Sequence, residues 1–121
     1  MPILDVEVVC EITRNNIARR LADAAANVFE SRPGSTWVKL RSLPRDNYAE
    51  NGDLPMEAQP VFVSVLLGRR YEAKEYAKAA TKIAEAFSKI LNRPTENIHI
   101  LFEPTAMGRM AFGGKLLMDA N

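Results

Sequence analysis

A chain of 121 residues is long enough for one hydrophobic core and too short for two independent ones, so we expect a single domain over residues 1–121. Its 16 Lys and Arg residues against 15 Asp and Glu residues leave a net charge of +1, which excludes a global field that would recruit nucleic acid or an anionic membrane. Cys10 is the only cysteine, which excludes an internal disulfide and fits a reducing compartment. No apolar run approaches the roughly 20 residues that span a bilayer, and Asp5 and Glu7 interrupt the apolar N-terminus, so we expect a cytoplasmic protein.

The first half of the chain predicts a strand, a helix and a second strand. Residues 2–9 read as the first strand. A helix is expected over about residues 13–31, because apolar residues recur there at helical spacing, and Arg32-Pro33-Gly34 ends it. The strand pattern resumes at residues 37–40. The apolar face of this helix is expected to take Ile17, Leu21, Ala24, Ala25, Val28 and Phe29.

The second half repeats this order. Strands are expected at residues 61–67 and 97–102, with a helix over about residues 71–91 between them that ends at Arg93-Pro94. The segment from residue 46 to residue 60 is rich in Asn, Gly, Asp and Pro, and it predicts a loop with room for a short hairpin. The core face of the second helix is expected to take Tyr76, Ala80, Ile83, Phe87 and Ile90.

The two Arg-Pro pairs lie roughly 60 residues apart, so units of about residues 2–45 and 60–118 indicate an internal duplication. Each unit joins two strands through a helix, and such a crossover makes the strands parallel and is right-handed. Two units side by side predict an α+β fold with a four-stranded sheet and both helices on one face. The other face carries Phe62, Leu66 and Leu101, and a large apolar patch of this kind marks an interface. We therefore expect an oligomer.

Pro2 directly follows the initiator Met1, so removal of the methionine would expose a secondary amine at the head of the first strand. An α-amino group titrates near pH 8, and burial beside other cations lowers that value toward neutrality, where a general base works best. Many chains begin with Met-Pro and have no such chemistry, so a purely structural proline is the alternative.

The tail has the sequence Gly108-Arg109-Met110-Ala111-Phe112-Gly113-Gly114-Lys115-Leu116, in which the paired glycines favour a tight hairpin turn. With the N-terminal proline, Gly68-Arg69 after the third strand and the doubled unit, this tail makes the chain resemble the tautomerase superfamily, the family of 4-oxalocrotonate tautomerase and macrophage migration inhibitory factor. The resemblance is strongest over residues 61–116 and looser over residues 2–45. It implies a homotrimer.

The resemblance also implies roles for particular residues. Pro2 falls on the family's catalytic N-terminal proline, the base that moves a proton next to a carbonyl group. Arg69 falls on the arginine that binds a substrate carboxylate or ketone oxygen. A guanidinium has a planar fork of donors that matches a carboxylate, and its positive charge stabilises negative charge that develops in the reaction. Arg70 and Arg109 are candidates for a second clamp, because a substrate with two carboxylates needs two.

Three departures from the family pattern affect substrate binding. The short tautomerases carry another arginine in the strand after the helix, and the matching places here hold His99 in the second unit and Val38 or Lys39 in the first. His99 is expected to face away from the core, either as a hydrogen-bonded structural group or as a ligand contact. The family's aromatic residue beside the proline aligns with Met110, which keeps the pocket apolar.

The two units are not equivalent. The first has Cys10-Glu11-Ile12 where the family's Leu-Gly-Arg would stand, and Pro60 in the second is an internal imide that cannot be a base. The resemblance therefore predicts one working site per chain, which pairs Pro2 with Arg69 and Met110.

The resemblance implies a cofactor-independent tautomerase or isomerase that acts on a small oxo or unsaturated carboxylic acid. A dehalogenase or decarboxylase of the same superfamily is the nearest alternative; Glu103 is the only acid near the end of the last long strand, which makes water activation less expected. A non-catalytic ligand-binding or interaction module on the same scaffold is the alternative from another class. The sequence contains no metal-ligand cluster or phosphate-binding glycine loop, and its strands lack the clustered aromatic and basic residues of an RNA-binding sheet.

Overall fold

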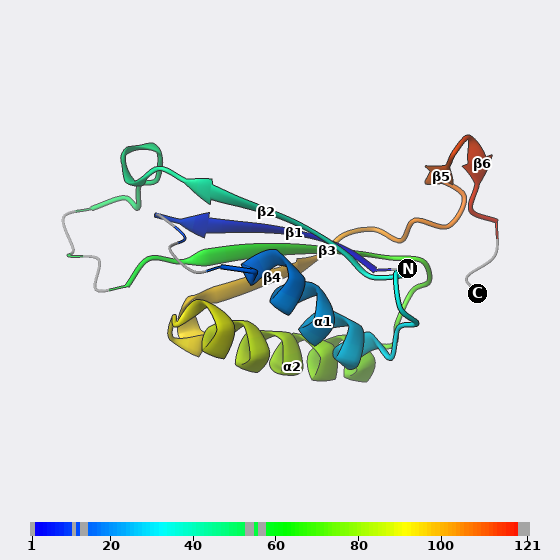
Figure 1. Ribbon diagram of the computed structural model, residues 1–121, viewed down its shortest axis with the longest axis horizontal. Coiled ribbons are helices and arrows are strands. Elements are labelled where there is room, and N and C mark those ends of the chain that lie inside the picture. Colours follow the sequence, from blue (N-terminus) through cyan, green and yellow to red (C-terminus); the bar gives the residue numbers. More distant parts are fainter. Residues whose placement is uncertain (1, 11, 13–14, 53–54, 56–57, 119–121) are drawn as a thin grey trace.

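The computed structural model describes residues 2–10, 12, 15–52, 55 and 58–118. Strands β1 (Pro2–Val9) and β2 (Trp37–Leu43) are parallel and are joined through helix α1 (Ile17–Phe29). Strands β3 (Val61–Leu67) and β4 (Ile98–Phe102) are parallel and are joined through helix α2 (Ala73–Leu91). β1 pairs antiparallel with β3, which gives the sheet order β2-β1-β3-β4. In the described part of the chain both helices cover one face of this sheet (Figure 1), so the predicted α+β architecture of two β-α-β units is confirmed.

The core lies between the sheet and the two helices. Alternate residues of β1 and β3 point toward the helices because side chains along a strand alternate between its faces. The predicted apolar face of α1 is confirmed, with Ile17, Leu21 and Ala25 fully buried. On α2 the buried stripe is Ala79, Ile83 and Phe87, so Ala79 takes the central place that the sequence pattern assigned to Ala80. The sheet contributes Leu4, Val6, Val8, Val61, Val63 and Val65 to the same core.

Both helices end in the same way. Glu30 after α1 and Asn92 after α2 adopt left-handed backbone conformations, with φ of 53° and 56°, and each backbone N–H donates back to the helix. The Arg-Pro pair follows one residue or two later, where the proline ring disfavours further helix. At the other end, α1 begins at Ile17 rather than near residue 13, because Asn16 is also left-handed. The earlier start falls partly on residues 13 and 14, which lie outside the described residues.

The tail forms the predicted hairpin. β5 (Ala111–Phe112) pairs with β6 (Lys115–Leu116), and the turn residues Gly113 and Gly114 both have positive φ, 59° and 85°, as a tight two-residue turn requires. The hairpin extends beyond the end of the sheet where β1 begins (Figure 1). Next to the turn, the Phe112 ring packs edge-on against Trp37 with 5.6 Å between centroids.

The linker between the two units begins with a short 3₁₀ turn, Arg45–Asn47, and residues 53–54 and 56–57 lie outside the described residues. No hairpin forms among the linker residues that the structure describes. Arg93 fixes the end of this linker, since its Nη1 donates to the Gln59 carbonyl at 2.8 Å and its Nη2 donates to the Val9 carbonyl at 3.0 Å. One side chain from the end of α2 thereby ties together the end of β1 and the start of β3.

Arg93→Ala is expected to lower the free energy of unfolding by about 2–3 kcal/mol, because hydrogen bonds to a charged group contribute about 1.5–3 kcal/mol. Urea denaturation measures the change. Arg32→Ala is the matched control, since Arg32 holds the equivalent place in the first unit and its guanidinium makes no hydrogen bond or ion pair among the described residues. The control should change the free energy by less than about 0.5 kcal/mol. Equal losses in the two variants would contradict the clamp.

Candidate active site

Pro2 stands at the first position of β1, opposite Leu67 at the end of β3. It is buried and shares the core-facing side of the strand with Leu4. A pocket of about 230 Å³ opens here between the strand ends and the end of α1. Its lining consists of Pro2, Phe29, Glu30, Ser31, Arg32, Ser35, Leu67, Gly68, Arg69 and Tyr71. The structure therefore brings Pro2 and Arg69 to one pocket within a single chain.

Arg69 leaves the end of β3 and is held from three directions. Its Nη2 forms an ion pair with Glu75 Oε2 at 3.1 Å, its Nη1 donates to the Arg70 carbonyl at 3.3 Å, and its guanidinium carbon lies 4.2 Å from the centre of the Tyr71 ring. The hydrogen bond to Glu75 raises the pKa of Arg69 above its ordinary value, so the guanidinium stays charged. A cation fixed in this way needs little reorganisation to meet an anion.

Glu75 and Tyr71 support this arginine. The backbone N–H of Glu72 donates to Glu75 Oε1 at 3.0 Å, and this bond together with Arg69 holds the pKa of Glu75 below its ordinary value. The Tyr71 ring packs against Phe29 and Tyr76, with centroids 6.2 Å and 5.5 Å away. Burial raises the pKa of the Tyr71 hydroxyl, so the ring is a neutral platform beneath the guanidinium.

Arg32 also lines the pocket, although its sequence motif indicates only the end of a helix. The turn that carries it is fixed by Ser35, whose backbone N–H and Oγ both donate to the Arg32 carbonyl, at 3.1 Å and 2.6 Å. The guanidinium forms no ion pair or hydrogen bond within the described part of the chain, so its donors are available to a ligand. Comparison with Arg93 could have identified it, because the second unit uses the equivalent arginine for structure.

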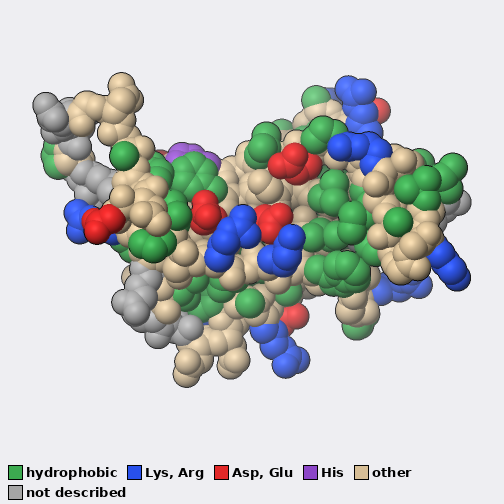
Figure 2. Space-filling model, turned by 90° about the horizontal axis from the view of Figure 1, so that it is seen from above, with side chains coloured by type: hydrophobic (Ala, Val, Ile, Leu, Met, Phe, Trp, Pro, Cys, Tyr) green, Lys and Arg blue, Asp and Glu red, His purple; other side chains and the backbone are tan. Residues whose placement is uncertain are grey.

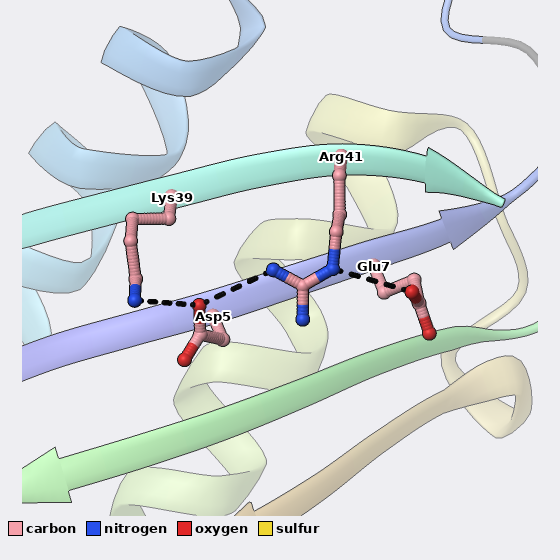
Figure 3. Close-up of polar contacts among 4 residues, drawn as sticks. All are labelled: Asp5, Glu7, Lys39 and Arg41. Atoms are coloured by element: carbon pink, nitrogen blue, oxygen red, sulfur yellow. Dashed lines mark hydrogen bonds and ion pairs between the residues drawn. The ribbon is translucent and has the colours of Figure 1, made fainter.

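Lys39, Arg109 and Met110 lie elsewhere, in a groove of about 440 Å³ on the helix-free face of the sheet. Lys39 Nζ pairs with Asp5 Oδ1 at 3.2 Å, and Arg41 bridges Asp5 and Glu7 at 3.5 Å and 3.3 Å (Figure 3). Arg109 Nη1 donates to the Thr105 carbonyl at 3.3 Å. The negative charges of Asp5 and Glu7 thus balance the positive charges of Lys39 and Arg41 on the strands of this groove. Within one chain, Met110 does not line the Pro2 pocket.

His99 and Arg70 also lie outside the pocket. His99 is exposed on the helix-free face and packs on Phe62, with 5.4 Å between ring centroids. His99 lies opposite Phe62 on β3 and Pro2 lies opposite Leu67, which separates the two along the sheet by roughly 17 Å. Arg70 is exposed beside the pocket, and its backbone carbonyl rather than its side chain contacts Arg69.

The described residues contain no group of three or more His, Cys, Asp or Glu side chains placed to hold a metal ion. None of the helices in the described part of the chain is long and apolar enough to cross a membrane.

Neither protein-family models nor curated proteins match the sequence. Solved structures share its fold. A fused 4-OT wild-type symmetric trimer aligns with a TM-score of 0.80 at 16% identity over 98% of this chain and 97% of that one. Macrophage migration inhibitory factor from Oncomelania hupensis aligns with a TM-score of 0.76 at 23% identity over 99% and 84%. FG41 malonate semialdehyde decarboxylase inhibited by 3-bromopropiolate aligns with a TM-score of 0.71 at 17% identity over 92% and 88%.

Proposed function

We propose that this chain, which has the fold of the tautomerase superfamily as its sequence resemblance predicted, is a cofactor-independent tautomerase. It would move a proton on a small oxo or unsaturated carboxylic acid, with the nitrogen of an exposed N-terminal Pro2 as the base. The observation that carries this proposal is the shared pocket of Pro2, Arg32 and Arg69.

The chemistry follows from what surrounds the nitrogen. Burial and two nearby guanidinium groups both disfavour a protonated amine, so the free amine would be populated near neutral pH. Arg69 and Arg32 would bind the substrate carboxylate or carbonyl oxygen, which places the carbon acid beside the nitrogen. As the proton leaves, negative charge develops on the carbonyl oxygen, and a fixed guanidinium stabilises it there.

A decarboxylase is the second candidate, and one residue favours it. Glu30 lines the Pro2 pocket, whereas Glu103, the acid considered from the sequence, lies in the groove on the opposite face. A carboxylate beside a protonated Pro2 could orient a water molecule for hydration chemistry. This alternative uses the same pocket and a different protonation state of the proline.

The assay that tests the proposal uses protein whose intact mass shows a free Pro2 amine. We expect it to ketonise phenylenolpyruvate or 2-hydroxymuconate. Turnover of malonate semialdehyde, abolished by Glu30→Gln and without ketonisation, would favour the decarboxylase instead. Absence of both activities would favour a non-catalytic binding module. In either case a reducing compartment such as the cytoplasm suits a chain whose only cysteine is Cys10.

We also propose that the protein is a homotrimer, assembled through the helix-free face of the sheet. This face carries exposed apolar side chains toward both ends, with the ion pairs of Figure 3 between them (Figure 2). Trp37, Phe62 and Leu101 are 48%, 38% and 60% exposed in the single chain. A second copy would remove them from water, which is the main driving force for association. The fused 4-OT neighbour with the same fold is itself a trimer. Assembly would also bring His99, Lys39, Arg109 and Met110 near a neighbouring chain.

Leu101→Asp is expected to convert the trimer to monomer at micromolar concentration, because a carboxylate would be buried without a partner at the interface. Light scattering measures the mass. Lys89→Glu, on the exposed side of α2, changes charge away from the sheet and should leave the trimer intact. A wild-type protein that scatters as a monomer would refute this assembly.

A further inference from the structure

A second hollow continues from the Pro2 pocket along the seam between the two helices. It measures about 270 Å³ and shares four lining residues with that pocket: Phe29, Glu30, Arg69 and Tyr71. From there it extends onto α2, where Glu75, Lys78, Ala79 and Lys82 complete it. The two hollows therefore meet at the Arg69–Tyr71 stack.

Two lysines of α2 line this seam, together with Arg69 and the acids Glu30 and Glu75. Lys78 and Lys82 are four residues apart on α2, so they lie on the same side of the helix, one turn from each other. Ala79, which is buried, leaves room beneath them. Neither lysine forms an ion pair or a side-chain hydrogen bond within the described ranges. Glu75, three residues before Lys78, is already taken by Arg69 and by the Glu72 N–H, and Glu85, three residues after Lys82, forms no ion pair with it among the described residues.

The length of the seam along α2 follows from the helix positions that line it. Seven residues of helix separate Glu75 from Lys82, which at 1.5 Å per residue is roughly 10 Å. A ligand held at Pro2 by its reacting end would have to extend across the Tyr71 platform to reach the lysines. An elongated molecule with a negative far end would reach from the Pro2 pocket into this seam.

We propose that the α1–α2 seam is a second subsite, in which Lys78 and Lys82 bind an anionic group at the far end of an elongated substrate whose oxo-acid end lies at Pro2. This inference rests on the proposed function and adds a length and charge preference to it. The lysines determine specificity and do not touch the reacting atoms.

The experiment compares matched pairs of 2-oxo acids of increasing chain length that do or do not carry a second carboxylate at the far end. Dissociation constants are measured by calorimetry on protein with a blocked Pro2 nitrogen, so that no turnover intervenes. The longest dicarboxylate is expected to bind wild-type protein about fivefold more tightly than its monocarboxylate counterpart, the size typical of exposed charge pairs. The ratio should fall to near one in the Lys78→Ala/Lys82→Ala double variant.

Lys74→Ala/Lys89→Ala is the control, since it removes the same charge from parts of α2 that do not line the seam. It should keep the wild-type ratio. An equal ratio in all three proteins would overturn the subsite. Because the measurement is of binding alone, a preserved preference without any ketonisation activity would leave the subsite standing and reject the tautomerase. Ketonisation activity without a preference for the dicarboxylate would reject the subsite and leave the tautomerase standing.

Discussion

Protein that retains Met1, or whose Pro2 nitrogen has been alkylated, is expected to ketonise phenylenolpyruvate at least about a hundredfold more slowly than protein that begins at Pro2. General base catalysis contributes on the order of 10²–10⁴ in rate, and the nitrogen's lone pair is the reagent that blocking removes. The ring itself stays in place at the head of β1, so the sheet register with Leu67 should not change. Steady-state kinetics on two samples separated by intact mass measure the effect.

The blocked protein also supplies its own structural control. Its circular dichroism spectrum and its mass in solution should match those of the free form, because the modification adds nothing to the core. Equal turnover by the two forms would make Pro2 a structural residue and would remove the basis of the proposed mechanism.

Arg69→Ala is expected to lower kcat/KM by tenfold to a hundredfold, since a charge-assisted hydrogen bond is worth roughly 1.5–3 kcal/mol. If Arg69 binds the substrate carboxylate in both ground and transition states, KM rises with a smaller change in kcat; if it stabilises the developing oxyanion, kcat falls as well. The side chain is 50% exposed, so the fold should tolerate its removal.

Arg70→Ala is the matched control, because the Arg70 side chain does not line the Pro2 pocket and should lose less activity. A second readout checks that the intended contact was removed. The pKa of Glu75 lies below its ordinary value partly through Arg69, so an NMR titration of Glu75 should give a higher midpoint in Arg69→Ala than in the wild type. Wild-type kinetics in Arg69→Ala would take this residue out of the site.

The fold could be predicted because its signals are local and repeated. Apolar periodicity predicted the buried face of α1 and, except for Ala79 in place of Ala80, that of α2, and the two Arg-Pro pairs indicated that the units share one plan. The paired glycines predicted the tail hairpin for a steric reason, since both turn residues need positive φ. The start of α1 was predicted too early because left-handed Asn16 is a backbone choice that periodicity does not encode.

The site was predicted only in part, because a pocket depends on which side of the sheet each residue reaches. The proximity of Pro2 and Arg69 could be predicted, because the antiparallel pairing of β1 and β3 places the start of β1 beside the end of β3. Met110 and Arg109 lie on a tail whose path after β4 is set by long-range packing on Trp37 and by the Ala106 backbone, which no local pattern reveals. Arg32 was overlooked because the same Arg-Pro motif serves structure in one unit and lines the pocket in the other.

Mass spectrometry after treatment with 3-bromopropiolate tests the central claim most directly. This alkynoate carries its carboxylate two carbons from the electrophilic C3, so the nitrogen of a free amine next to Arg32 and Arg69 should add to C3 as the triple bond opens and the amine proton passes to C2. The account predicts one adduct per chain, located on the N-terminal peptide at Pro2, and strongly reduced labelling in Arg69→Ala. An adduct on Cys10 or on a lysine, with Pro2 unmodified and ketonisation activity intact, would contradict it.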